Sequence, residues 1–218
     1  MVEPEAAAKA SIWVLAGTNG AGKSSIAGAF LRESGGDYFN PDEVARLLRS
    51  RDPALSAIEA NGKAWRLGLR QLEQAIFARR DYFFETTLGG KSIAARLSQA
   101  LSAGREVRIW YAGLKTPELH IARVAARVSA GGHAISAQDI RRRFDQSRRN
   151  LVALLPRLTE LQLYDNSAEA DPKQGHVPAP RLLLHWSQGA IVAPPNLRAT
   201  PEWAKPIVAQ AIKHALAP

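Results

Sequence analysis

Residues 17–24 of the chain read GTNGAGKS, which matches the phosphate-binding (Walker A) pattern G-x-x-x-x-G-K-[ST] at every fixed position. The apolar run 12–16 precedes this loop, and residues 25–31 follow it with apolar side chains at helical spacing. A strand, a glycine-rich turn and a helix in this order present backbone N–H groups to phosphate at the positive end of a helix dipole. The loop therefore predicts an α/β fold built around a nucleotide site.

Individual residues of the loop have distinct expected roles. Lys23 is expected to reach the β- and γ-phosphates, and the Ser24 hydroxyl is expected to ligate Mg²⁺. The predicted nucleotide-binding residues of this segment are Gly17, Asn19, Gly20, Ala21, Gly22, Lys23, Ser24 and Ser25.

The composition is that of a globular protein. At 218 residues, 46% apolar and 22% charged, residues 1–218 are expected to form one domain, with a tail at 1–10 and a C-terminal extension at 168–218. The chain has no cysteine, which excludes disulfides and thiolate metal sites. Its apolar runs are shorter than a membrane span of about 20 residues or a signal peptide requires, so we expect a cytoplasmic protein that does not enter a membrane.

Strand and helix patterns alternate along the chain. Strands are predicted at residues 12–16, 38–39, 82–85, 107–112 and 161–164, and helices at about 25–31, 58–79, 93–103 and 137–155. Two further helices should begin at Pro41 and Pro117, behind the capping residues Asn40 and Thr116. The expected fold is a three-layer α/β P-loop kinase fold, with a mostly parallel five-stranded sheet and helices on both faces. A hairpin at 181–193 and a terminal helix from about residue 200 would form a small extension.

Polar residues follow several predicted strands, at the edge where α/β sheets bind ligands. Asp42 and Glu85 are expected near the γ-phosphate, where one would accept a proton from a substrate hydroxyl and the other would bind substrate or a metal-bound water. Asn166, after the last strand, joins the predicted nucleotide-binding residues. A simpler role for Asp42 is to complement the helix dipole, and Glu43 is expected to be structural, in a capping box.

The net charge of +9 arises from 29 basic and 20 acidic residues, and much of the excess lies between residues 141 and 157. The arginines of this stretch are Arg141, Arg142, Arg143, Arg148, Arg149 and Arg157. Three roles are compatible with these arginines: electrostatic attraction of an anionic nucleotide and substrate, binding of nucleic acid, or a solvent-exposed helix face. A mobile lid is expected at Gly131-Gly132-His133, which lies between two predicted helices and follows Arg127 in the sequence. Arginines on this lid would neutralise the charge that develops during phosphate transfer.

Taken together, several segments resemble the zeta toxin family of kinases. They are residues 16–25, Asn40-Pro41-Asp42, Phe84-Glu85-Thr86-Thr87-Leu88, residues 123–128 with Gly131-Gly132-His133, Arg142-Arg143-Phe144 and Tyr164-Asp165-Asn166-Ser167. The similarity covers residues 10–167 in the same order, and the region after 170 adds nothing to it.

This resemblance implies a kinase of adenylate-kinase-like architecture that uses ATP and Mg²⁺. The acceptor would be a hydroxyl of a nucleotide sugar such as UDP-N-acetylglucosamine, and a small antitoxin would be a partner. By the same resemblance, Asp42 is the catalytic base, Glu85 and Thr87 contact the acceptor, and Arg127 and Arg143 clamp the phosphates.

Two other functions remain open at this point. A nucleic-acid kinase fits the basic composition, but it needs aromatic side chains to stack bases, and Phe144 is the only aromatic residue between Arg141 and Arg157. A nucleotide-dependent switch is the second alternative, although the sequence has no Asn-Lys-x-Asp segment to read guanine.

Overall fold

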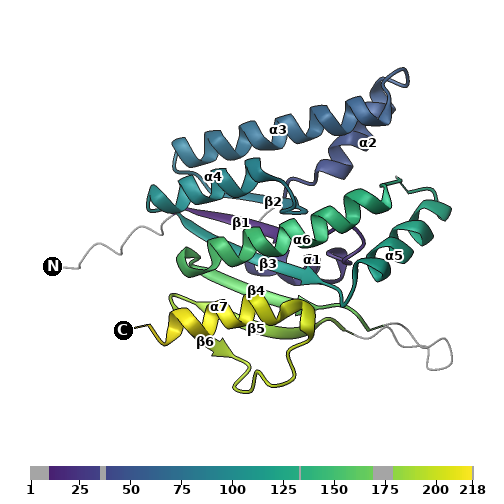
Figure 1. The fold of residues 1–218 in the computed structure, drawn as a ribbon. Coiled ribbons are helices and arrows are strands. Elements are labelled where there is room, and N and C mark those ends of the chain that lie inside the picture. Colours follow the sequence, from purple (N-terminus) through teal and green to yellow (C-terminus); the bar gives the residue numbers. More distant parts are fainter. Residues whose placement is uncertain (1–9, 35–37, 133, 169–178, 218) are drawn as a thin grey trace.

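The computed structural model describes residues 10–34, 38–132, 134–168 and 179–217, and its centre is one six-stranded sheet (Figure 1). The strand order is β2-β1-β3-β4-β5-β6. Four strands pair in parallel, namely β1 (Ser11–Ala16), β2 (Tyr82–Thr86), β3 (Glu106–Gly113) and β4 (Glu160–Asp165). The strands β5 (Arg181–Ser187) and β6 (Ala190–Ala193) continue the sheet in antiparallel pairing.

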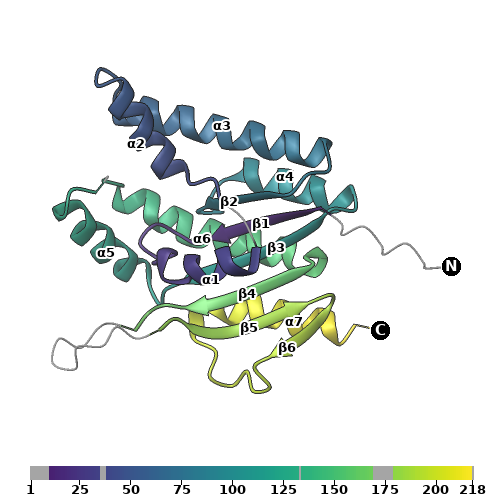
Figure 2. The same ribbon diagram turned by 180° about the vertical axis from the view of Figure 1, so that it is seen from behind.

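Helices cover both faces of this sheet (Figures 1 and 2). The helices are α1 (Ser24–Ser34), α2 (Pro41–Arg51), α3 (Ala57–Phe77), α4 (Lys91–Ser102), α5 (Pro117–Ser129), α6 (Ala137–Leu154) and α7 (Lys205–Ala215), with 3-10 turns at Leu155–Arg157 and Glu202–Ala204. One face packs against α3, α4, α6 and α7, and the other packs against α1. Among the described residues, none of these helices is long and apolar enough to cross a membrane.

Strand β1 carries apolar side chains on both faces, because both faces are covered by helices. In β1, Ile12 and Val14 belong to the larger core, whereas Leu15 faces Ile26 and Phe30 of α1. All five side chains are at most 4% exposed. β1 lies between β2 and β3 and is covered on both faces, so the loop that follows it opens at the carboxyl edge of the parallel strands.

The expected α/β class is confirmed, but the expected strand count was wrong in two places. The predicted hairpin forms as β5 and β6, but it adds two strands to the sheet, because β5 pairs with β4 (Leu163 opposite Leu184) and Trp186 packs into the larger core. The predicted strand at residues 38–39 is a single bridge between Phe39 and Phe84 within the described residues. Most of the predicted tail, residues 1–9, and residues 169–178 of the predicted extension lie outside the described residues.

Helix caps determine where α2 and α5 begin, as the sequence predicts. The Asn40 side chain accepts hydrogen bonds from the backbone N–H groups of Asp42 (2.9 Å) and Glu43 (3.4 Å). Thr116 accepts one from Leu119 N–H at 3.2 Å. Phe39, just before the cap, is hydrogen-bonded to β2 on both sides, through Phe83 and Glu85. This anchoring holds the first turn of α2, and Asp42 with it, beside the carboxyl edge of the sheet.

Candidate active site

The phosphate-binding loop joins β1 to α1, and its glycines are required by its shape. Gly22 has a φ of +74°, and a Cβ at this position would lie 2.2 Å from Asn166 Nδ2. The Asn166 amide donates to the carbonyl oxygen of Ala21 at 2.9 Å. Asn166 therefore lies directly behind the loop and holds its backbone, a position next to the predicted nucleotide site.

Lys23 is held between the loop and the end of β2. Its Nζ donates to the carbonyl oxygen of Gly17 at 2.9 Å and lies 3.4 Å from Glu85 Oε1. The two side chains are only 10% and 15% exposed. Glu85 Oε2 in turn accepts from Asn40 Nδ2 at 3.4 Å. A continuous series of contacts thus runs from the phosphate loop through Lys23 and Glu85 to the cap of α2.

Ser24 and Ser25 are exposed at the first turn of α1, at the positive end of its helix dipole. A hydroxyl oxygen beside Lys23 at a helix N-terminus fits the oxygen chemistry that Mg²⁺ requires. Within the described part of the chain, no group of three or more His, Asp or Glu side chains is placed to hold a metal by itself.

Asn19 is buried and is contacted from two helices. Its side-chain oxygen accepts from Arg143 of α6 at 2.7 Å, and its carbonyl oxygen lies 2.9 Å from His120 Nδ1 of α5. The Arg143 side chain reaches the loop across Gly89, where a Cβ would lie 2.9 Å from Arg143 Cγ. The predicted clamping residue Arg143 is therefore placed on the phosphate loop itself.

His120 is a site residue that the sequence analysis missed. Because the Asn19 carbonyl only accepts, Nδ1 carries the proton, and the buried Nε2 has no hydrogen-bond partner in the described structure. Burial lowers the pKa of His120 to about 4, since a second proton would create a buried donor without an acceptor. Its position one helical turn before the buried Val124 resembles an ordinary core position, so no sequence signal distinguishes it.

We expect His120 to make the fold acid-sensitive. Unfolded chains bind a proton at histidine below about pH 6.5, whereas folded His120 binds one only near pH 4. The free energy of unfolding should therefore fall between pH 6.5 and 4, by up to about 3 kcal/mol from this group. His120→Asn, whose amide can still donate to Asn19, should lack this component. Urea unfolding of the wild-type and His120→Asn chains across this pH range measures the free energy of unfolding of each. If the difference between the two free energies does not change with pH, the expected acid sensitivity of His120 is contradicted.

The turn after β2 is fixed by α6. Ser147 Oγ donates to the Thr87 carbonyl at 2.7 Å, and Asn150 Nδ2 donates to the Leu88 carbonyl at 2.7 Å. The Thr87 hydroxyl accepts from Gly89 N–H at 3.3 Å, within the same turn. Thr87, predicted to contact the acceptor, thus lies on a turn held by α6, and Glu85, at the end of β2, contacts Lys23.

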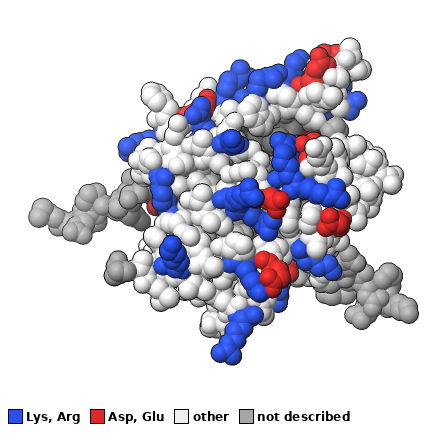
Figure 3. Space-filling view, in the orientation of Figure 1, with Lys and Arg blue, Asp and Glu red and all other residues white. Residues whose placement is uncertain are grey.

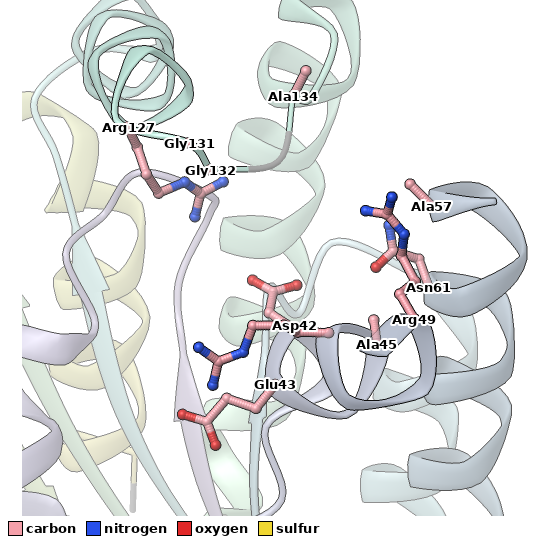
Figure 4. Close-up of a pocket in the computed structure, with 11 residues that line it drawn as sticks. Asp42, Glu43, Ala45, Arg49, Ala57, Asn61, Arg127, Gly131, Gly132 and Ala134 are labelled. Atoms are coloured by element: carbon pink, nitrogen blue, oxygen red, sulfur yellow. The ribbon is translucent and has the colours of Figure 1, made fainter. Parts of the chain in front are cut away.

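Asp42 and Arg127 face a different part of the site, a cavity of about 510 Å³ between α2 and the end of α5. Figure 4 shows both side chains pointing into it from opposite walls. Gly131 and Gly132 line the cavity beside Arg127, and His133 lies outside the described residues. The two predicted clamping arginines are therefore separated, with Arg143 on the phosphate loop and Arg127 over the cavity.

Most of the other arginines in the basic stretch have local partners. Arg141 pairs with Glu118 (3.4 Å), Arg142 with Asp139 (2.5 Å) and Arg148 with Asp145 (2.5 Å). Arg157 donates to Ser98 and Ser102 of α4. Acidic side chains are interspersed with basic ones on this face of the molecule (Figure 3). The single aromatic residue of the stretch, Phe144, is buried. These positions disfavour a base-stacking nucleic-acid surface here.

A glycine-rich loop between β1 and α1, with its lysine at the carboxyl edge of a largely parallel sheet, defines a P-loop nucleotide-binding fold. The family model described as Zeta toxin matches residues 3–170, and the chain belongs to this family. An uncharacterized protein of Haemophilus influenzae is 34% identical over 128 residues, which cover 59% of this chain and 88% of that protein.

Solved structures share this fold. The complex of AvrRxo1-ORF1 and AvrRxo1-ORF2 with sulphate ions has a TM-score of 0.62 at 14% identity, covering 95% of this chain and 77% of that chain. The same complex with ATP has a TM-score of 0.63 at 14% identity, covering 96% and 65%. The PezAT chromosomal toxin–antitoxin system of Streptococcus pneumoniae has a TM-score of 0.50 at 14% identity, covering 78% and 74%. At these identities the likeness shows the fold alone.

Proposed function

We propose that this chain is an ATP-dependent kinase that transfers the γ-phosphate to a hydroxyl of a small molecule, such as the nucleotide sugar UDP-N-acetylglucosamine. The proposal rests on a series of contacts that connects the phosphate-binding loop with the cavity between α2 and the end of α5. Lys23 contacts Glu85, Glu85 contacts Asn40, and Asn40 caps the helix that presents Asp42 to the cavity. Nucleotide loop and acceptor cavity are thereby held at one edge of the sheet.

In this proposal the loop holds the donor. The loop backbone and Lys23 bind the β- and γ-phosphates of ATP, and Ser24 ligates Mg²⁺, which neutralises phosphate charge when bound. Arg143, whose guanidinium donates to Asn19 of the loop at 2.7 Å, clamps the phosphates. The structure with ATP among the similar folds supports ATP as the donor.

The cavity holds the acceptor in the same proposal. Asp42 accepts the proton of the attacking hydroxyl, and Arg127, on the opposite wall, neutralises the charge that develops on the transferring group. Glu85, at the end of β2, and Thr87, in the turn after it, orient the acceptor. The family and the PezAT toxin–antitoxin system support a role as a toxin with a small antitoxin partner, and the cytoplasm is the compartment that we propose for it.

The experiment is a transfer assay with γ-labelled ATP, Mg²⁺ and UDP-N-acetylglucosamine. With the purified chain we expect a labelled product that carries one phosphate more than UDP-N-acetylglucosamine. With Lys23→Ala we expect only background label. Label found only at RNA or DNA ends would contradict the proposal and favour a nucleic-acid kinase. Absence of transfer to any hydroxyl in a metabolite extract, combined with nucleotide-dependent partner binding, would favour a switch protein.

A further inference from the structure

A second cavity, of about 550 Å³, lies between the last turns of α3 and α4. Its lining includes Phe77 and Arg79 at the end of α3, and Gln99 and Arg105 on and after α4. Each of these helices leads into a parallel strand, α3 into β2 and α4 into β3, so the cavity lies at the amino edge of the sheet (Figure 1). The phosphate-binding loop follows β1, at the carboxyl edge, so the two sites lie at opposite edges.

Arg105 brings a buried positive charge to this cavity. The residue is only 6% exposed, and its NH2 group donates to the carbonyl oxygen of Arg80 at 2.8 Å. Its buried Nε and NH1 atoms have no hydrogen-bond partner among the described residues. Burial and the charge of Arg79 lower the pKa of Arg105, whereas Asp81 acts in the opposite direction. Asp81 accepts instead from the backbone N–H of Ser11 at 2.6 Å, so the buried guanidinium is left without an ion-pair partner in the described structure.

Arg79 occupies a backbone position that favours glycine. Helices α3 and α4 end in the same way, because the backbone N–H groups of Arg80 (3.1 Å) and Arg105 (3.0 Å) each donate to a carbonyl five residues earlier. This ending places the preceding residue in the left-handed region. That residue is Gly104 after α4, with a φ of +71°, but Arg79 after α3, with a φ of +50°. Since a side chain costs free energy there, the chain carries a guanidinium at the cavity where glycine would be more stable.

Complementation of the helix dipoles is the simpler role for basic residues at the ends of α3 and α4. It accounts for the bond from Arg105 to the Arg80 carbonyl. It does not account for two donor atoms of Arg105 without acceptors, or for the repulsion between Arg79 and Arg105. The third arginine of the lining, Arg96, is already paired with Glu73 at 2.6 Å, which leaves Arg79 and Arg105 in excess. An anion in the cavity would supply the negative charge that these two guanidinium groups lack.

Phe77 gives the same cavity an exposed aromatic ring. The residue is 93% exposed, and it lines the cavity beside the partly buried Ile76. Planar rings such as nucleobases stack on exposed aromatic side chains, and guanidinium groups bind phosphate oxygens. A volume of about 550 Å³ lies in the range of small-molecule sites. The lining therefore matches a small ligand in which a planar ring adjoins an anionic group.

We propose that this cavity is a second ligand site, which binds a small molecule that joins a phosphate group to a planar ring, as a mononucleotide does. The phosphate lies at Arg79 and compensates the buried charge of Arg105, and the ring stacks on Phe77. The inference is independent of the proposed kinase function, because the site at the carboxyl edge shares none of these residues.

A binding experiment tests this site. The chain is first saturated with Mg²⁺ and a non-hydrolysable ATP analogue, so that the phosphate loop is filled. Calorimetric titrations then compare adenosine and uridine 5′-monophosphates with adenosine, uridine and inorganic phosphate. We expect at least one nucleotide to bind about tenfold or more tightly than its nucleoside and than inorganic phosphate.

Three variants assign the binding to the cavity. Arg79→Gly and Phe77→Ala should each remove most of the nucleotide binding. Because glycine fits the backbone at residue 79, Arg79→Gly should keep or raise the unfolding midpoint, so a loss of binding is not a loss of fold. Arg70→Gln is the matched control, since Arg70 is an exposed arginine of the same helix that does not line the cavity. It should retain the binding.

Several outcomes would overturn the inference. They are binding of neither nucleotide, binding that is unchanged in both Arg79→Gly and Phe77→Ala, and inorganic phosphate or a nucleoside that binds as tightly as its nucleotide. An acidic peptide that binds in an Arg79-dependent manner when neither nucleotide does would instead make the cavity a protein-docking surface. Nucleotide binding that depends on Arg79 and Phe77 supports the inference even if γ-phosphate transfer fails, and that failure counts against the kinase function alone.

Discussion

Replacing Lys23 with alanine is expected to lower ATP turnover by about 10²–10³-fold, the usual effect of removing one preorganised charge from a reacting phosphate. The same change should also lower stability, because Glu85 is only 15% exposed and loses its cationic partner at 3.4 Å. Breaking a largely buried pair costs up to about 3 kcal/mol. Steady-state kinetics and thermal unfolding measure the two effects separately.

A second substitution distinguishes catalysis from folding. In the double variant Lys23→Ala/Glu85→Gln, the Glu85 carboxylate that has no cationic partner in Lys23→Ala is replaced by a neutral amide. The unfolding midpoint should therefore rise back toward the wild-type value, while ATP turnover stays low. Lys213→Ala, on the exposed end of α7, is the control for loss of a lysine. Wild-type turnover in either Lys23 variant would rule out the phosphate-binding role of the loop.

The parts of this molecule that could be predicted from sequence are those encoded by neighbouring residues. The loop from Gly17 to Ser24 and the caps Asn40 and Thr116 act within a few residues of themselves, so their spacing alone predicts the turn or helix that forms. Asn40 thus predicts where α2 begins, whereas the pairing of Phe39 with β2 places Asp42 beside the sheet edge.

The features that were missed depend on contacts between distant segments. The pattern of residues 181–193 fits a free hairpin and an edge extension equally well, and pairing with β4 is decided by the packing of Trp186 against the larger core. Likewise, Glu85 meets Lys23 because β2 lies next to β1, which is a property of strand order. His120 has the spacing of a core residue, and only the fold brings it to Asn19.

Asp42→Asn is expected to lower kcat by at least about 10²-fold with little change in the KM for ATP, since Asp42 faces the cavity and the loss is that of a general base. Glu43→Gln is the matched control. Glu43 is the other first-turn carboxylate of α2 and lines the same cavity, so both variants lose a similar dipole interaction, about 0.3–1 kcal/mol. We expect Glu43→Gln to stay within a few-fold of the wild-type kcat.

The dependence of kcat on pH separates the base from the arginines. At high pH the acceptor hydroxyl needs less help to lose its proton, so the defect of Asp42→Asn should become smaller. The defects of Arg127→Ala and Arg143→Ala should persist, because hydroxide does not replace a missing positive charge at the transferring phosphate. Equal and small effects of Asp42→Asn and Glu43→Gln would instead make Asp42 a helix-dipole residue. Glu85, in contact with Lys23 at the end of β2, would then be the base to test.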